Sequence, residues 1–143
     1  MVEEKTPLIL VVLASAFERV HYALATAAAA AAADRPTILF FTQGAVRAVA
    51  GTASMPGWTD LPVADSSLGG VDAGSLEATY RTRGVAGFEE LLMVCQELGV
   101  TFLVCSMGLR VASLTRQGLR GDLALTETGL VDVLSRRGTL SFI

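Results

Sequence analysis

Cys105 is the side chain of this sequence whose type and position are best suited to chemistry. It ends an apolar run, Thr101–Cys105, that is typical of a buried strand, and a short helix is expected from Ser106 or Met107 onward. The backbone N–H groups and positive dipole end of such a helix favour the thiolate form of a cysteine. A thiolate there can attack a persulfide or a disulfide and carry a transferred sulfur atom. A second interpretation stays open, because free cysteine often packs in a core as a small apolar side chain.

The turns after the predicted strands supply the expected neighbours of Cys105. Open parallel sheets form their sites at the carboxyl ends of strands. We therefore predict a pocket at these turns, composed of Ser15, His21, Gln43, Gly44, Ser106, Met107 and Gly108. His21 is the single histidine of the chain. It either reaches back toward the pocket as a proton donor or lies on an exposed or interface side of its helix.

Apolar runs and helix-forming segments alternate along the chain. Strands are predicted at residues 8–13, 37–42, 101–105, 123–125 and 139–143. Helices are predicted at residues 16–33, 44–50, 85–98, 107–114 and 128–137, the first of them with Ser15 as its N-cap. This order predicts a single three-layer α/β domain over residues 1–143 with a mainly parallel sheet.

Residues 51–84 differ from the rest of the chain. Glycine and proline interrupt this stretch repeatedly, and no period of a strand or helix persists through it. A long irregular loop is expected here. Loops of this length are usually functional or ordered by another subunit, and a mobile insertion is the other interpretation.

Charge and hydropathy exclude several classes of partner. Eleven basic and fourteen acidic residues give a net charge of −3 without a basic run, which argues against binding of nucleic acid. Mean hydropathy is high, at +0.53. Charged residues interrupt the most apolar window, and Glu3 and Glu4 make the N-terminus acidic, so we predict neither an integral membrane segment nor a signal peptide and expect a cytoplasmic protein. The alanine-rich surface of Ala23–Ala33 predicts contact with another subunit in a homo-oligomer.

Sequence motifs for other chemistries are missing. Hydrolase and nucleotide-binding motifs (GxSxG, GxxxxGK[ST], GxGxxG) are absent, and two cysteines with one histidine predict no metal site and no bound cofactor. Cys95 falls on the apolar stripe of its predicted helix, so we expect core packing and no disulfide with Cys105.

Several segments resemble the DsrE/DsrF-like small sulfur-relay proteins, some of which are also labelled peroxiredoxin-like. The matching segments are FFTQGA at residues 40–45, MPG at 55–57, ELGVTFLVCSMGL at 97–109, GLVDVL at 129–134 and the terminal LSFI. The resemblance implies a parallel α/β fold of the DsrE type, assembly as trimers or hexamers, and a cysteine that receives sulfane sulfur as a persulfide. Cys105 matches that cysteine. The methionine-rich insertion of related sequences is shortened here, at about residues 55–74.

Two functions from different classes remain in view. The first is a cytoplasmic sulfur carrier or sulfurtransferase-like protein that takes sulfur from a donor protein onto Cys105 and passes it to an acceptor protein. The alternative is a non-enzymatic oligomeric module that binds a small molecule or acts as a scaffold, with Cys105 an inert wall residue. Peroxide reduction is disfavoured, because Cys95 is expected in the core and no other cysteine can resolve an oxidised Cys105.

Overall fold

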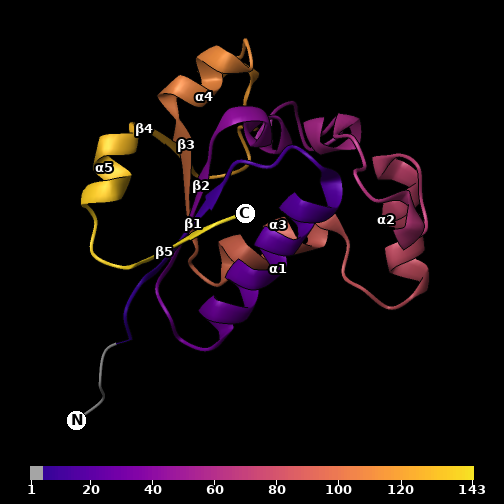
Figure 1. The fold of residues 1–143 in the computed structure, drawn as a ribbon, viewed down its shortest axis with the longest axis horizontal. Helices are drawn as coiled ribbons and strands as arrows, with labels where there is room; N and C mark the ends of the chain where they lie inside the picture. The colour runs from indigo at the N-terminus through magenta and orange to yellow at the C-terminus, as the bar shows by residue number, and fades with distance from the viewer. Residues whose placement is uncertain (1–4) are drawn as a thin grey trace.

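The chain folds into one five-stranded parallel sheet flanked by helices (Figure 1). The computed structural model describes residues 5–143. The strands are β1 (Leu8–Val12), β2 (Thr37–Phe41), β3 (Thr101–Cys105), β4 (Leu125–Thr128) and β5 (Thr139–Phe142). The α-helices are α1 (Phe17–Ala32), α2 (Ala73–Thr82), α3 (Phe88–Glu97), α4 (Ser106–Val111) and α5 (Leu130–Ser135). The predicted three-layer α/β class is confirmed.

The strand order, β4-β3-β2-β1-β5, reverses direction once. From β1 to β4 each strand adds beside its predecessor, and the chain then crosses the whole sheet to place β5 on the other side of β1. Crossovers between parallel strands are right-handed, so a reversal moves the following helix to the opposite face. Helices α1 and α3 accordingly pack on one face, while α5 packs on the other. The reversal lies between β1 and β5.

Strand β1 explains why the sheet is apolar on both faces. All five of its residues are buried, as the uninterrupted run Leu8–Val12 predicts for a central parallel strand. Leu10 and Val12 face α1 and α3 and belong to the large cluster of buried side chains. Ile9 and Val11 point to the other face, into a small cluster that α5 covers. The small cluster consists of Ile9, Val11, Phe40, Leu103, Cys105 and Val133.

The alanine tract of α1 serves packing within the chain. Ala23 and Ala27 are fully buried, and the Cys95 Sγ of α3 lies 3.4 Å from the Leu24 carbonyl oxygen and donates to it. Small side chains let the two helix backbones approach closely enough for this contact. The predicted subunit contact through Ala23–Ala33 therefore has a competing use, and only the end of the tract, at Ala29, Ala32 and Ala33, is exposed.

Residues 51–84 are more regular than expected. They contain two short 3₁₀ helices and the ten-residue helix α2, which begins with a reciprocal cap between Asp72 and Ser75. The sequence pattern missed α2 because only Ala73 and Leu76 of this helix are buried, too few to mark an apolar stripe. The segment is also tied to α3, since the Trp58 Nε1 donates to Glu89 Oε2 at 2.7 Å.

Smaller predictions need correction at the ends of elements. Ala16, not Ser15, occupies the N-cap of α1, and no side chain caps it. The predicted helix at residues 44–50 is a 3₁₀ helix, Gln43–Val49. The fourth strand spans 125–128 rather than 123–125, because it is the four residues after Ala124 that pair with β3. Among residues 5–143, no helix has both the length and the apolar character needed to cross a membrane.

Candidate functional site

Cys105 occupies the predicted place in the fold. It is the last residue of β3 and the N-cap residue of α4, at the carboxyl edge of the parallel sheet. This edge is where open α/β folds carry their sites. The position of the sulfur along the chain therefore agrees with the sequence analysis, whereas its surroundings differ from it.

The Cys105 side chain is enclosed rather than open. The residue is 1% exposed, and its apolar neighbours are those of the small cluster, including Leu103 and Val133. Although Cys105 is the N-cap of α4, its side chain makes no capping hydrogen bond to that helix. The expected exposed sulfur facing the amides of a helix is thus not found. The reason is the long crossover from β4 to β5, which lays α5 over this part of the sheet.

The residues after Cys105 hold α4 close to the neighbouring turns. The Ser106 Oγ donates to Glu127 Oε2 at 2.9 Å, toward β4. Met107 is half exposed. Gly108 packs against the backbone after β2, where an added Cβ would lie 2.9 Å from the Gln43 backbone nitrogen. Glycine is required at that position for the helix to approach the turn.

Two predicted pocket residues meet at the next turn. An added Cβ on Gly44 would lie 2.7 Å from the Ser15 Cβ, so the turns after β1 and β2 are in direct contact. Gln43 holds a left-handed backbone conformation, with φ of 50°. Ser15, Gln43, Gly44 and Gly108 are therefore neighbours as predicted, but they pack against one another and do not line the cleft described below.

His21 lies away from this group. Its Nε2 is 2.8 Å from the Ala86 carbonyl oxygen, and its ring is edge-on to Tyr80 at 4.8 Å and near Phe17 at 5.9 Å. The histidine is buried in an aromatic cluster beside α2 and α3. Neither predicted alternative holds, because His21 is neither at the strand-end pocket nor exposed, and its hydrogen bond and aromatic contacts account for its burial.

Helix α5 is the element that packs on the small cluster to which Cys105 belongs. It has six residues, of which only Val133 is buried. A link through Asp132 joins α5 to the sheet, because Thr128 Oγ1 donates to Asp132 Oδ2 at 3.0 Å and Arg136 Nη2 donates to the same oxygen at 3.0 Å. The hydrogen bond from Thr128 and then those from Arg136 lower the pKa of Asp132. Val133 and the bond from Thr128 to Asp132 thus attach α5 to the face of the sheet that carries the small cluster.

Cys95 has the environment that the sequence predicts. It is fully buried between α3 and α1, and burial raises the pKa of its thiol to about 12. Both cysteines are free thiols. With so high a pKa, the Cys95 thiol stays protonated and unreactive at physiological pH.

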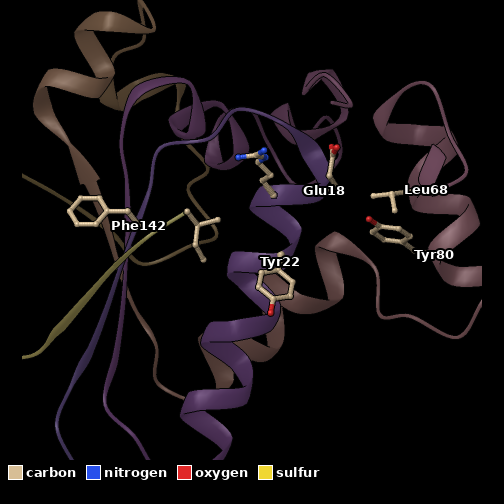
Figure 2. Close-up of a pocket in the computed structure, with 7 residues that line it drawn as sticks. Glu18, Tyr22, Leu68, Tyr80 and Phe142 are labelled. Carbon is tan, nitrogen blue, oxygen red and sulfur yellow. The ribbon is translucent and has the colours of Figure 1, made fainter. Parts of the chain in front are cut away.

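A cleft lies at the carboxyl edge of the sheet where the strand order reverses. It has a volume of about 510 Å³ and lies between the first turns of α1, the end of β5 and the segment that carries α2. Figure 2 shows Glu18 and Tyr22 on α1 with Leu68 and Tyr80 across the opening from them. No sequence pattern predicts this cleft, because its walls come from residues near 20, 70, 80 and 143 that only the tertiary fold brings together.

Comparison with known proteins adds no family to these observations. No protein-family model matches the chain, and a search of curated proteins finds no similar sequence. No group of three or more metal-binding side chains occurs within residues 5–143. The resemblance to sulfur-relay proteins accordingly stays a prediction.

Proposed function

We propose that the protein is a sulfur carrier that holds sulfane sulfur as a persulfide on Cys105. The thiolate of Cys105 attacks the outer sulfur of a donor persulfide. A new S–S bond forms at Cys105 Sγ while the S–S bond of the donor breaks, and the donor leaves as a thiolate. The same exchange in reverse delivers the sulfur to an acceptor thiol, so no external oxidant or reductant is consumed.

The position of Cys105 at the carboxyl end of β3, directly before α4, is the observation that carries this proposal. The segment ELGVTFLVCSMGL around it is also the most specific part of the resemblance to the DsrE/DsrF-like proteins. Support comes further from the parallel five-stranded sheet, which is the fold class that the resemblance implies.

Burial of the thiol makes sulfur transfer depend on movement of α5. A donor persulfide cannot reach a residue that is 1% exposed while α5 packs on the small cluster that contains it. Exposing the Val133 side chain costs about 1.5–3 kcal/mol, to which the side chains uncovered beneath it add, while the large cluster on the other face stays buried. Short elements with few buried contacts are those that open locally. Opening of α5 is therefore the step that admits the donor.

Mass spectrometry of the intact protein after incubation with a low-molecular-weight persulfide tests this function. The wild-type protein gains one sulfur atom, Cys105→Ser gains none, and Cys95→Ser gains as much as the wild type. Excess dithiothreitol removes the added sulfur. Absence of the adduct on the wild type, or an adduct that Cys105→Ser retains, would contradict the assignment.

The partners and setting belong to the same proposal. The resemblance implies sulfur donor and acceptor proteins and a homotrimer or hexamer, and the charge pattern of the sequence predicts the cytoplasmic location. Sedimentation at micromolar concentration checks the assembly, since a species of monomer mass alone would contradict it.

A second function, a small-molecule-binding or scaffolding module with an inert Cys105, is favoured by the enclosure of the sulfur and by the missing capping hydrogen bond. The two functions differ in the reactivity of this thiol. Titration with a thiol reagent in Cys95→Ser separates them, because an inert Cys105 reacts only when the whole protein unfolds. Sulfur loading with retained folding excludes the inert module.

A further inference from the structure

The cleft at the strand-order reversal has the position of a ligand site. In open parallel sheets, ligands bind outside the carboxyl ends of the strands where the order reverses, which here is between β1 and β5. The cleft is walled by Glu18 and Arg19 of α1, which follows β1, and by Ile143, which follows β5. Its volume of about 510 Å³ lies within the range of small-molecule sites.

The carboxylate of Glu18 already accepts hydrogen bonds from within the chain. Its Oε2 accepts hydrogen bonds from the backbone nitrogens of Ala64, at 3.0 Å, and Asp65, at 2.7 Å. Asp65 is hydrogen-bonded in a similar way, because its Oδ1 accepts from the Ser67 backbone nitrogen at 3.0 Å. Glu18 thus holds the segment before α2 against α1, and Asp65 binds within that segment. The charge of each acid is partly balanced by the amides that it binds.

Tyr80 presents a neutral hydroxyl group at the same cleft. Burial first, and then the charges of Glu18 and Asp65, raise the pKa of the Tyr80 phenol. The phenol therefore stays protonated at physiological pH and can donate a hydrogen bond. Figure 2 shows the Tyr80 ring next to Leu68, across the opening from α1.

Arg19 provides the positive charge of the cleft. Its side chain is exposed, and within residues 5–143 no ion pair or hydrogen bond occupies its guanidinium. A guanidinium binds carboxylates through two parallel hydrogen bonds. The apolar part of the wall comes from Tyr22, Leu68 and Ile143. The ring of Phe142 points away from the opening in Figure 2, so we assign it no contact with a ligand.

We propose that this cleft binds a small organic acid, with its carboxylate on Arg19 and its apolar body against Tyr22, Leu68 and Tyr80. An ammonium ligand is the competing choice, because the charges of Glu18 and Asp65 would attract it. We favour the acid because the carboxylate oxygens of these two residues already accept backbone hydrogen bonds, whereas the Arg19 guanidinium makes no hydrogen bond or ion pair within residues 5–143. The inference is independent of sulfur transfer, since Cys105 belongs to the small cluster under α5 and is not part of the cleft.

Isothermal titration calorimetry with matched probes tests the site. The probes are phenylacetate and hexanoate as acids, 2-phenylethanol as the neutral analogue and 2-phenylethylamine as the cation. The acids bind the wild-type protein at least about tenfold more tightly than the neutral analogue does, since one charged hydrogen-bonded contact is worth that much. Raising the salt concentration weakens the binding of the acids only.

Variants locate the binding within the cleft. Arg19→Gln lowers the affinity for the acids about tenfold, to that of the alcohol, and Tyr80→Phe lowers it by a smaller factor. Arg110→Gln is the matched control, because Arg110 is an exposed arginine on α4 outside the cleft. Cys105→Ser binds as the wild type does. Circular dichroism confirms that each variant is folded.

Three results would overturn the assignment. The first is that neither acid binds at millimolar concentration. The second is that acids, alcohol and amine bind equally, or that the amine binds best. The third is that Arg19→Gln and Arg110→Gln weaken binding to the same extent, which would indicate a general charge effect.

Discussion

The two faces of the sheet are covered by clusters of very different size. Helices α1 and α3 cover one face and, with Trp58 and Phe88, bury a continuous cluster that includes several aromatic rings. The other face carries the small cluster, and α5 contributes only Val133 to it. We therefore expect the thick side, with the large cluster, to hold the domain together and the thin side, with the small cluster, to open without loss of the fold.

The two cysteines show what this difference means for reactivity. Cys95 is on the thick side, where burial raises the pKa of its thiol to about 12 and two long helices enclose it. Cys105 is on the thin side, where the short helix α5 contributes one buried residue. Both residues are buried in the static structure, so burial alone does not distinguish a structural thiol from a functional one. We use instead the number of buried side chains that must move before the thiol is exposed, which is large for Cys95 and small for Cys105.

Truncating one side chain on each face produces the largest difference in stability. Phe17 is fully buried and touches the rings of Trp58 and Phe88, so Phe17→Ala lowers the free energy of unfolding by about 3–5 kcal/mol. Val133→Ala lowers it by about 2 kcal/mol or less. Urea unfolding followed by circular dichroism measures both. Equal losses would contradict the difference in cover.

The matched control for Val133 is its neighbour Val131, which is 80% exposed. Val131→Ala changes the free energy of unfolding by less than about 0.5 kcal/mol. A loss for Val131→Ala as large as that for Val133→Ala would mean that α5 packs differently from this structure.

A buried arginine on the thick side gives the next effect. The Arg120 side chain is fully buried and pairs with Glu89 at 2.5 Å and with Asp122 at 2.6 Å. Arg120→Leu lowers the free energy of unfolding by about 1–3 kcal/mol, because both carboxylates stay partly exposed and remain hydrated after its loss. It also shifts the fluorescence of Trp58, which donates to Glu89. Unchanged stability and fluorescence would show that Arg120 does not stabilise this side of the sheet.

The Asp132 link predicts the smallest effect, on the opening of α5 alone. Asp132→Asn weakens the bonds from Thr128 and Arg136, so the amides of α5 exchange hydrogen about twofold faster while those of α3 are unchanged. The pKa of Asp132 is lowered in the folded state. The link is therefore intact above the ordinary carboxyl pKa and is lost as the pH falls through the lowered value. Hydrogen exchange that rises equally in α3 would indicate general destabilisation.

The sequence pattern was sufficient for the main sheet and insufficient for the site. The apolar run Leu8–Val12 predicts a central parallel strand because both faces of such a strand are buried. The sequence leaves open whether Cys105 is exposed or packed in the core. Local periodicity cannot decide between the two, since it does not encode the strand order that carries α5 across this face of the sheet. Helix α2 was missed for a related reason, because its caps at Asp72 and Ser75 are polar and its apolar face is short.

The cleft could not be predicted from any local pattern in the sequence. Tyr80 and Ile143 lie far apart along the chain, and only the reversal of strand order places them near Arg19. For His21, by contrast, the sequence predicts surroundings that the structure does not show. The sequence predicts either a proton donor at the pocket or an exposed or interface histidine, whereas the His21 ring is buried against the Ala86 carbonyl oxygen and aromatic neighbours.

The rate at which each thiol reacts in the folded protein, divided by its rate in the unfolded protein, tests the central claim most directly. Labelling of Cys95→Ser and Cys105→Ser with a small alkylating reagent isolates each thiol. We expect Cys105 to be labelled at least about a hundredfold faster than Cys95, with folding intact, because α5 opens without global unfolding. Equal ratios for the two thiols, both set by global unfolding, would contradict a carrier role for Cys105.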